Sequence, residues 1–376
     1  MDHLSTEEIQ RYSRHLLMPE VSPEGQIKLK QAKVLIVGLG GLGSPAAYYL
    51  AAAGVGMLGL ADFDQVELTN LQRQILYNSE NVGKSKVEIA ENRLQSINPF
   101  IHIISHKIKL SAKNAFDIMK KYDIIIDGTD NFSSRYLIND ACVLLSKPYV
   151  YGSVYRFEGK VSVFAFNNGP CYRCLYPESP LPGSVPGCAE GGVLGVLPGI
   201  IGSLQAVEAI KLILGKGNTL SGRLLLFDGM DLKFTEMALR KNPQCAVCGI
   251  EPTITKLTDY REFCGSPEND EQWEISPKNL KKILNQGDKV VLLDVRNPEE
   301  VKISNIQNSI LIPLPDLPRR LAELNKNEMI IVYCRIGERS MNAVELLKKA
   351  GFEKVRNLTG GINAWAEQVD HSLVKY

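Results

Sequence analysis

The sequence predicts an α/β fold in which a doubly wound sheet is followed by a second, smaller α/β domain. Short apolar runs alternate with helical patterns up to about residue 165, and the same alternation resumes after about residue 273. The 376 residues, of which 44% are hydrophobic, are enough for two or three compact domains. We expect residues 1–250 to form the first domain, 251–272 a linker and 273–376 the second domain.

In the first domain, helical patterns cover residues 6–17 and 44–53, and strand patterns cover residues 34–37, 56–60, 101–104 and 124–127. Asp130 and Asn131 follow the last of these strands. Ligands of open α/β sheets bind at the carboxyl ends of the strands. We therefore expect Asp130 near Gly41, which follows the strand at 34–37.

A glycine-rich turn joins that strand to the next helix. Gly38, Gly40 and Gly43 have the spacing that lets a backbone approach phosphate at a helix N-terminus, and Asp62 lies where a Rossmann-like fold places its ribose-binding acid. Arg73 and Lys86 add cationic groups, which suit a triphosphate better than the pyrophosphate of a nicotinamide cofactor. The motif favours a nucleoside triphosphate, and an NAD-dependent oxidoreductase with an appended domain is the alternative.

Four of the eight cysteines form two Cys-x-x-Cys pairs, Cys171 with Cys174 and Cys245 with Cys248. Four thiolates at this spacing are typical of a structural zinc site, and a redox pair is the competing interpretation. None of the five histidines lies near either pair in the sequence. We expect zinc here, and a structural role for Cys142 and Cys264.

Two segments are poor in periodic patterns. Residues 169–192 are rich in proline and glycine and contain Cys188, so we expect a mobile crossover above the site rather than a packed element. Residues 249–271 have little periodicity and indicate the linker between the domains.

The second domain has strand patterns at residues 290–295, 329–333 and 354–357 and a helical pattern at 340–350. Between a strand and this helix lies a loop that begins at Cys334 and contains Arg335 and Arg339. Backbone N–H groups, a helix N-terminus and two inward-facing arginines would stabilise a sulfur anion on Cys334. The same loop would hold a persulfide.

Composition excludes some partners. The 43 basic and 42 acidic residues give a net charge of +1, so overall charge predicts neither a nucleic-acid nor a membrane partner. The apolar stretch at 191–214 is interrupted by polar residues and favours a buried helix over a membrane span. The polar, acidic first residues do not look like a targeting peptide. We expect a cytoplasmic protein, or one of the organelle stroma if the gene is organellar.

Residues 1 to about 250 resemble the MoeB/ThiF branch of the adenylyltransferases related to ubiquitin-activating enzymes. Residues 273–376 resemble a rhodanese domain, through the Cys334 loop and the run from Leu358 to Trp365. Together they resemble fused adenylyltransferase–sulfurtransferases. The resemblance implies that ATP adenylates the Gly-Gly carboxylate of a small ubiquitin-like sulfur carrier, and that sulfur from a Cys334 persulfide then gives a thiocarboxylate.

The resemblance also implies the site residues. ATP and Mg²⁺ would be bound by Gly41, Asp62, Thr69, Asn70, Leu71, Gln72, Arg73, Lys86, Asp130 and Asn131, of which Arg73, Lys86 and Asp130 would be catalytic. Arg14 would enter the site of a partner subunit, which implies a homodimer. Cys334 would be catalytic, and the involvement of Cys188 is left open. Ser304-Asn305-Ile306 departs from the family's Gly-His-Ile and concerns docking of the sulfur donor.

The carrier itself has no short signature. The molybdopterin synthase small subunit is the first choice, because Arg73-Gln74 and the segment flanking the zinc cysteines look most like that branch. Carriers of thiamine synthesis, tRNA thiolation and cysteine synthesis are alternatives, and thiosulfate or a cysteine desulfurase persulfide would supply sulfur. A scaffold without chemistry is a third class of function, which an intact Cys334 disfavours.

Overall fold

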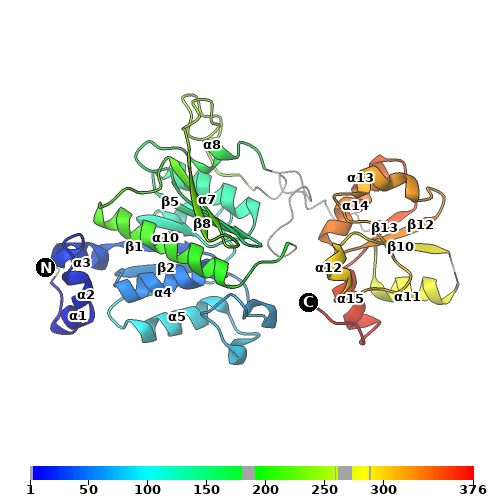
Figure 1. Cartoon of the computed structure of the whole chain (residues 1–376), viewed down its shortest axis with the longest axis horizontal. Coiled ribbons are helices and arrows are strands. Elements are labelled where there is room, and N and C mark those ends of the chain that lie inside the picture. Colours follow the sequence, from blue (N-terminus) through cyan, green and yellow to red (C-terminus); the bar gives the residue numbers. More distant parts are fainter. Residues whose placement is uncertain (1–2, 180–190, 259, 261–272, 288) are drawn as a thin grey trace. The chain divides into compact units, whose positions relative to one another are not determined.

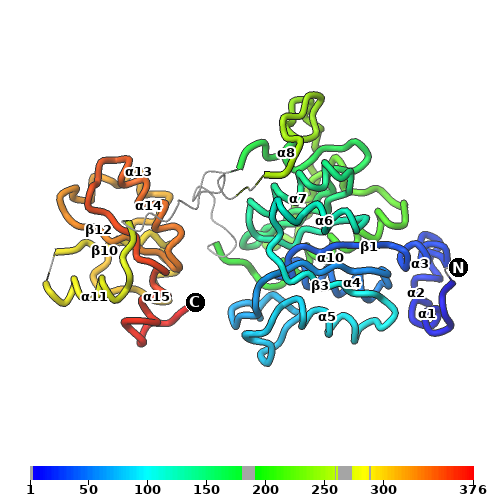
Figure 2. The backbone as a smooth tube through the Cα atoms, turned by 180° about the vertical axis from the view of Figure 1, so that it is seen from behind, coloured from blue at the N-terminus to red at the C-terminus, as the bar shows by residue number. Residues whose placement is uncertain are grey.

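A computed structural model describes residues 3–179, 191–258, 260, 273–287 and 289–376. The chain divides into two compact units (Figures 1 and 2). Apart from the residues outside this description, the first unit reaches Tyr260 and the second begins at Trp273.

The first unit contains a sheet of eight strands in the order β3-β2-β1-β4-β5-β6-β7-β8. Neighbours from β3 to β5 are parallel, and those from β5 to β8 are antiparallel. The strands are β1 (Lys33–Val37), β2 (Met57–Ala61), β3 (His102–His106), β4 (Ile124–Asp127), β5 (Tyr149–Tyr155), β6 (Glu158–Phe164), β7 (Arg223–Asp228) and β8 (Lys233–Ala238). The predicted doubly wound sheet is confirmed, with β1 in the middle of its five parallel strands.

Helices cover both faces of this sheet because the buried residues of β1 alternate between two cores. Val34 and Ile36 pack with α3 (Ser22–Gln31), α4 (Gly43–Ala53), α5 (Lys86–Ile97) and α10 (Val196–Leu214). Leu35 and Val37 pack with α6 (Ala115–Met119) and α7 (Phe132–Leu144). Figure 1 shows α10 in front of the sheet, and the view from behind in Figure 2 brings α6 and α7 forward.

Helix α10 is, among the described helices, the one that is long and apolar enough to cross a membrane. It packs on α4 and β5 and supplies Ala206, Ala209 and Leu214 to the core. The structure therefore supports its interpretation as a core helix.

The predicted helix over residues 6–17 is broken into α1 (Thr6–Arg11) and α2 (Ser13–Leu16). Tyr12 lies between them with φ −94° and ψ 12° and is buried. Its hydroxyl accepts a hydrogen bond from Asn98 Nδ2 at 2.7 Å. This long-range contact, which no local pattern reveals, accompanies the bend.

The start of the predicted mobile crossover is instead packed. Cys171 and Tyr172 are buried, and α8 (Tyr172–Leu175) follows. The Tyr172 ring lies against Tyr136, Tyr151 and other aromatic rings. Residues 180–190 lie outside the described part of the chain.

The predicted linker also begins with packed residues. Ile254 N donates to Ala246 O at 2.8 Å, and Tyr260 is buried with its hydroxyl bonded to Asp140. The end of the first domain at residue 250 remains a prediction, but the chain stays attached to the first unit beyond that point.

The second unit has five parallel strands in the order β11-β10-β12-β13-β9. They are β9 (Glu274–Ile275), β10 (Val290–Asp294), β11 (Ile310–Leu311), β12 (Met329–Tyr333) and β13 (Val355–Leu358). The helices are α11 (Pro277–Asn285), α12 (Pro298–Val301), α13 (Leu317–Arg320), α14 (Glu338–Lys349) and α15 (Gly361–Gln368). The predicted strands and the helix at 340–350 correspond to β10, β12, β13 and α14.

Candidate functional sites

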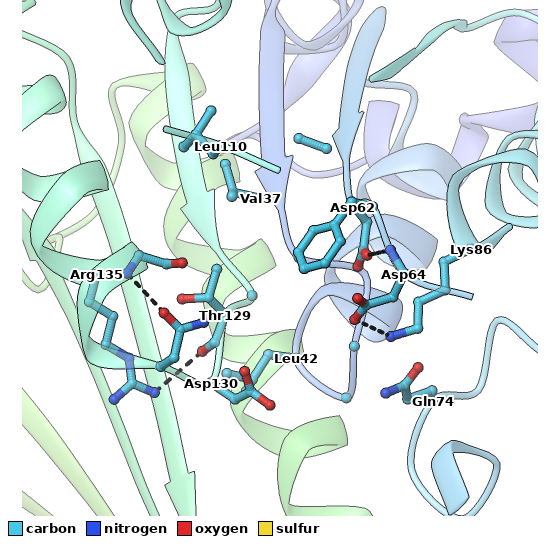
Figure 3. A pocket seen from close by; sticks show the side chains of 18 of the residues that line it. Val37, Leu42, Asp62, Asp64, Gln74, Lys86, Leu110, Thr129, Asp130 and Arg135 are labelled. Atoms are coloured by element: carbon cyan, nitrogen blue, oxygen red, sulfur yellow. Dashed lines mark hydrogen bonds and ion pairs between the residues drawn. The ribbon is translucent and has the colours of Figure 1, made fainter. Parts of the chain in front are cut away.

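A cavity of about 280 Å³ opens at the carboxyl ends of β1, β2 and β4. Six of the residues predicted from the sequence line it: Gly41, Asp62, Arg73, Lys86, Asp130 and Asn131. Figure 3 shows the labelled Asp62, Asp64 and Lys86 on one side of this cavity, with Thr129, Asp130 and Arg135 on the other. The fold therefore brings together residues that are up to 90 positions apart in the chain, from Gly41 to Asn131.

Glycine shapes the turn between β1 and α4. Gly38 has φ +87°, and a Cβ there would lie 2.8 Å from the carbonyl carbon and oxygen of Gly128, in the turn after β4. A Cβ at Gly43 would lie 1.9 Å from Gly38 O. Only glycine allows these close approaches, which place the first turn of α4 at the cavity and give it the character of an anion site.

Asp62 lines the cavity and also holds this turn by hydrogen bonds. One carboxylate oxygen accepts from Leu39 N and the other from Asp64 N, both at 2.8 Å. Tyr77 donates to Leu39 O at 3.0 Å. The turn is thereby held in place by side chains from outside the glycine motif.

Two cationic side chains line the same cavity. Lys86 is nearly buried and lies 3.0 Å from an oxygen of Asp64. Arg73 Nη1 donates to Thr69 O at 3.0 Å. Because each cation is held by a partner, neither has to be ordered by the ligand alone.

A buried carboxylate at the end of β4 precedes the residues of the opposite wall. Asp127 accepts from Thr129 N at 2.8 Å and from Tyr149 Oη at 2.6 Å. Burial raises the pKa of Asp127, although Arg135 and these hydrogen bonds oppose that shift. Asp127 thus positions the turn that carries Asp130, whose own side chain is exposed.

The sequence analysis assigned some residues to the site that do not line the cavity. Thr69, Asn70, Leu71 and Gln72 are not among its lining residues. They form or flank η1 (Leu68–Asn70), and Asn70 O accepts from both Arg73 N and Gln74 N at 3.1 and 2.9 Å. This run supports Arg73 rather than forming the wall of the cavity.

Other lining residues were not assigned: Asp64, Gln74, Thr129 and Arg135. Gln74 is buried, and its Oε1 has no hydrogen-bond partner among the described residues. The sequence marked two of these residues only through their positions. Gln74 directly follows Arg73, and Arg135 lies one helical turn after Asn131. Arg14, on α2, is exposed and does not line the cavity, so its predicted role depends on a second subunit.

The four cysteines of the two Cys-x-x-Cys pairs converge. Their Sγ atoms all lie within 4.8 Å of one another, with 3.5 Å between Cys171 and Cys245 and 3.4 Å between Cys174 and Cys248. Zinc at ~2.3 Å from four thiolates needs sulfur separations of ~3.8 Å, whereas a disulfide needs ~2.05 Å. The cluster fits a closed tetrahedral zinc site and does not fit a disulfide pair.

In the second unit, Cys334 is buried at the end of β12. Its Sγ accepts hydrogen bonds from Gly337 N at 3.1 Å and from Ser340 Oγ at 3.4 Å. These two donors and the N-terminus of α14 can stabilise a sulfur anion. The loop therefore supplies a backbone N–H and a helix N-terminus at the sulfur, as the sequence predicts.

The structure pairs Arg339 with a carboxylate, so its expected role of facing the sulfur stays a prediction. Its guanidinium forms a two-pronged ion pair with Glu300, at 2.8 and 2.7 Å. Arg335 is half-buried, and its guanidinium forms no hydrogen bond or ion pair with the described residues, although its carbonyl oxygen accepts from Asn363 N at 3.1 Å. Glu300 lies 39 positions before Arg339 in the chain. The loop motif alone therefore could not reveal this ion pair.

Of the remaining cysteines, Cys142 is fully buried in the core around α7, which raises the pKa of its thiol. This agrees with a structural role. Cys188 and Cys264 lie outside the described residues.

Two family models match the chain: the ThiF family over residues 12–247 and the Rhodanese-like domain over residues 276–368. Similar proteins include the Probable adenylyltransferase/sulfurtransferase MoeZ of Mycobacterium tuberculosis, 47% identical over 99% of this chain and 96% of MoeZ. Adenylyltransferase and sulfurtransferase MOCS3 of Aedes aegypti is 43% identical over 100% of this chain and 91% of that protein.

Solved structures similar to this chain include E. coli MccB with ATP, with a TM-score of 0.56 and 25% identity. That similarity covers 66% of this chain and 76% of the MccB chain. MccB in complex with N-formylated MccA has a TM-score of 0.57 and 26% identity over 64% of this chain and 75% of that one.

Proposed function

Because the chain belongs to the ThiF family and continues into a rhodanese-like domain, we propose that it activates a small ubiquitin-like sulfur carrier and converts its C-terminal carboxylate into a thiocarboxylate. It is an adenylyltransferase and a sulfurtransferase, as its full-length relatives are. Membership of this ATP-using family decides against the nicotinamide oxidoreductase interpretation.

The observation that carries the adenylation proposal is the clustering of Arg73, Lys86 and the α4 N-terminus around one cavity. In the proposed reaction, the carrier carboxylate attacks the α-phosphate of ATP and pyrophosphate leaves. The cations offset the charge on the leaving pyrophosphate, while the α4 N–H groups hold phosphate oxygens. Asp62 lies where it can hold the ribose. A carboxylate is a poor acyl donor, and AMP makes it a good one.

Magnesium fits the same cavity through Asp130. Its carboxylate is exposed at the rim and has no hydrogen-bond partner among the described residues, and Mg²⁺ prefers oxygen ligands of this kind. Magnesium would shield the phosphate charges when bound. Asn131, the N-cap of α7, lies beside it and holds its own helix by accepting from Ser134 N at 2.9 Å.

In the proposed sulfur step, the terminal sulfur of a Cys334 persulfide attacks the acyl carbon and displaces AMP, leaving an acyl disulfide on Cys334. A second thiol then attacks the Cys334 sulfur and releases the thiocarboxylate. This attack forms a disulfide between the second thiol and Cys334, which an external thiol reduces. Cys188 is a candidate for the second thiol. The two hydrogen bonds to Cys334 Sγ support this residue as the sulfur carrier.

We propose the molybdopterin synthase small subunit as the carrier, with carriers of thiamine synthesis, tRNA thiolation or cysteine synthesis as alternatives. Thiosulfate or a cysteine desulfurase persulfide would supply sulfur. A homodimer would bring Arg14 to the partner's cavity, which is consistent with its exposed position on α2. We further propose that the enzyme acts in the cytoplasm.

The test is to incubate the full-length protein with each candidate carrier, ATP and thiosulfate, and to weigh the carrier by mass spectrometry. The preferred carrier should exchange one oxygen for one sulfur, and omission of ATP should prevent this. If no Gly-Gly carrier gains sulfur or supports exchange of pyrophosphate into ATP, the proposed function is wrong.

A further inference from the structure

A network of charged and polar groups lies beside the persulfide loop, and the sulfur chemistry described above does not use it. The two guanidinium prongs of Arg339 contact the two carboxylate oxygens of Glu300. The side chains are only 8% and 12% exposed, respectively. A charge-assisted pair of this geometry is strong and fixes the direction of both groups.

Glu300 is held from two further sides. Asn297 N donates to it at 3.0 Å, and the Tyr376 hydroxyl donates at 3.2 Å while accepting from Arg296 Nη1 at 2.8 Å. Burial would raise the pKa of Glu300, but the Arg339 pair and the Asn297 N–H bring it below its ordinary value. Burial raises the pKa of Tyr376 to about 12, so its hydroxyl keeps its proton. Glu300 is therefore a carboxylate at neutral pH.

The network adjoins the loop that holds the reactive sulfur. Arg339 stands in the chain between Gly337 and Ser340, the two residues that donate to Cys334 Sγ. In a buried site, a charge carried by the same loop affects whether a thiol ionises. With Glu300 in place, the charge of Arg339 is neutralised.

Other charged or titratable groups of the described residues also belong to this loop or adjoin it. Arg296 is neutralised by Asp294, with Nη2 2.6 Å from Oδ2. Arg335 and Glu338 belong to the loop and the start of α14, and Glu338 is exposed. Tyr333, which precedes the cysteine, is buried, and its pKa is raised, so it stays neutral. Arg296 and Arg339 are each paired with a carboxylate, whereas Arg335 forms no ion pair with the described residues.

We propose that Glu300 is a positioning residue that sets the reactivity of Cys334 by neutralising Arg339. The sulfur anion is then stabilised by the Gly337 N–H and the Ser340 hydroxyl, and Arg335 remains available to attract an anionic sulfur donor. The inference rests on the proposed role of Cys334 as the sulfur carrier.

The test measures alkylation of Cys334 by iodoacetamide against pH in the full-length protein, with the Cys334 peptide quantified by mass spectrometry. Glu300→Gln removes the negative charge but keeps a side chain that can accept from Arg339, so the midpoint of alkylation should fall by about one pH unit. Arg339→Gln leaves the Glu300 charge unpaired and should raise the midpoint by a similar amount. The double variant should return close to wild type, as should Glu300→Asp.

Glu323→Gln is the matched control, because Glu323 forms a similar two-pronged pair with Arg320 on the surface of the same unit. It should leave the midpoint unchanged. A purely structural role would move both single variants in one direction and would make the double variant worse. That outcome, or an unchanged midpoint in Arg339→Gln, would overturn the inference.

Formation of the persulfide from thiosulfate is measured on the same proteins. A wild-type enzyme that forms no persulfide on Cys334 would refute the proposed sulfur role, whereas the alkylation midpoints report on Glu300 independently.

Discussion

Single side chains around the nucleotide cavity combine binding with the maintenance of local structure. Asp62 lines the cavity and also accepts from the backbone of the glycine-rich turn. Lys86 reaches the cavity while paired with Asp64. Substitutions of these two residues would disturb the turn or the pair as well as the ligand. Arg73 and Asp130 are better probes, because fewer contacts depend on them.

We expect Arg73→Ala to lower carrier-dependent exchange of pyrophosphate into ATP by about 100-fold or more, since it removes a cation from a site of developing negative charge. Asp130→Ala should have a comparable effect. Arg93→Ala is the control, because Arg93 is exposed, bonds Tyr48 and lies outside the cavity. Formation of the persulfide should be unchanged in all three. Exchange at the wild-type rate in either cavity variant would mean that ATP binds elsewhere.

At the scale of elements, α7 connects the cavity to the cysteine cluster. Its N-terminus carries Asn131 and Arg135 on the cavity wall, and its middle holds the segment between Cys171 and Cys174. Asn139 Oδ1 accepts from Tyr172 N at 2.7 Å, and fully buried Asp140 forms a two-pronged pair with Arg173. The cluster is therefore attached to the same helix that forms part of the cavity.

Arg173→Ala should lower the free energy of unfolding of the first unit by about 3–5 kcal/mol, because it leaves the buried Asp140 carboxylate without its cationic partner. Glu236→Gln is the control, since the Arg223–Glu236 pair is largely exposed and contributes about 1 kcal/mol or less. Urea denaturation followed by fluorescence measures both. Equal losses in the two variants would contradict the assigned importance of the buried pair.

Cys245→Ser should reduce bound zinc and the melting temperature together, because a metal held by four thiolates contributes to folding. A loss of about 4 kcal/mol would lower Tm by roughly 10 °C in a unit of this size. Cys142→Ala should retain its zinc, since Cys142 lies in another core cluster. Metal analysis and calorimetry test this, and protein purified without chelator that contains no zinc would refute it.

The sequence predicted those elements whose pattern is local. Strands β1, β2 and β4 were recognisable because continuous apolar runs end in glycine or acidic residues that a parallel sheet places at one edge. The break at Tyr12 and the packing of Tyr172 depend on Asn98 and on aromatic rings far along the chain. Local periodicity carries no signal for such contacts.

The same distinction applies to the sites. Gly41, Asp62, Arg73, Lys86 and Asp130 belong to short motifs, and the topology of the sheet brings them to one cavity. The ion pair of Arg339 with Glu300 is tertiary, so the loop motif suggested a cation facing sulfur where the structure has a neutralised pair. The role of Cys188 was open from the sequence and stays a prediction.

At the scale of the whole molecule, each unit has its own sheet and its own cores, and the residues proposed for adenylation and for persulfide formation lie on different units. The two chemistries should therefore be separable by substitution. Cys334→Ala should abolish formation of the thiocarboxylate from thiosulfate while leaving formation of the acyl-adenylate intact.

Free sulfide should restore some thiocarboxylate to the Cys334→Ala enzyme, since sulfide can attack the acyl-adenylate directly and displace AMP. Cys188→Ala should keep the persulfide and lose product only if its thiol releases the thiocarboxylate from Cys334. Mass spectrometry of the carrier and of the Cys334 peptide distinguishes these outcomes. If Cys334→Ala still makes thiocarboxylate from thiosulfate at the wild-type rate, the second unit is not the source of the sulfur.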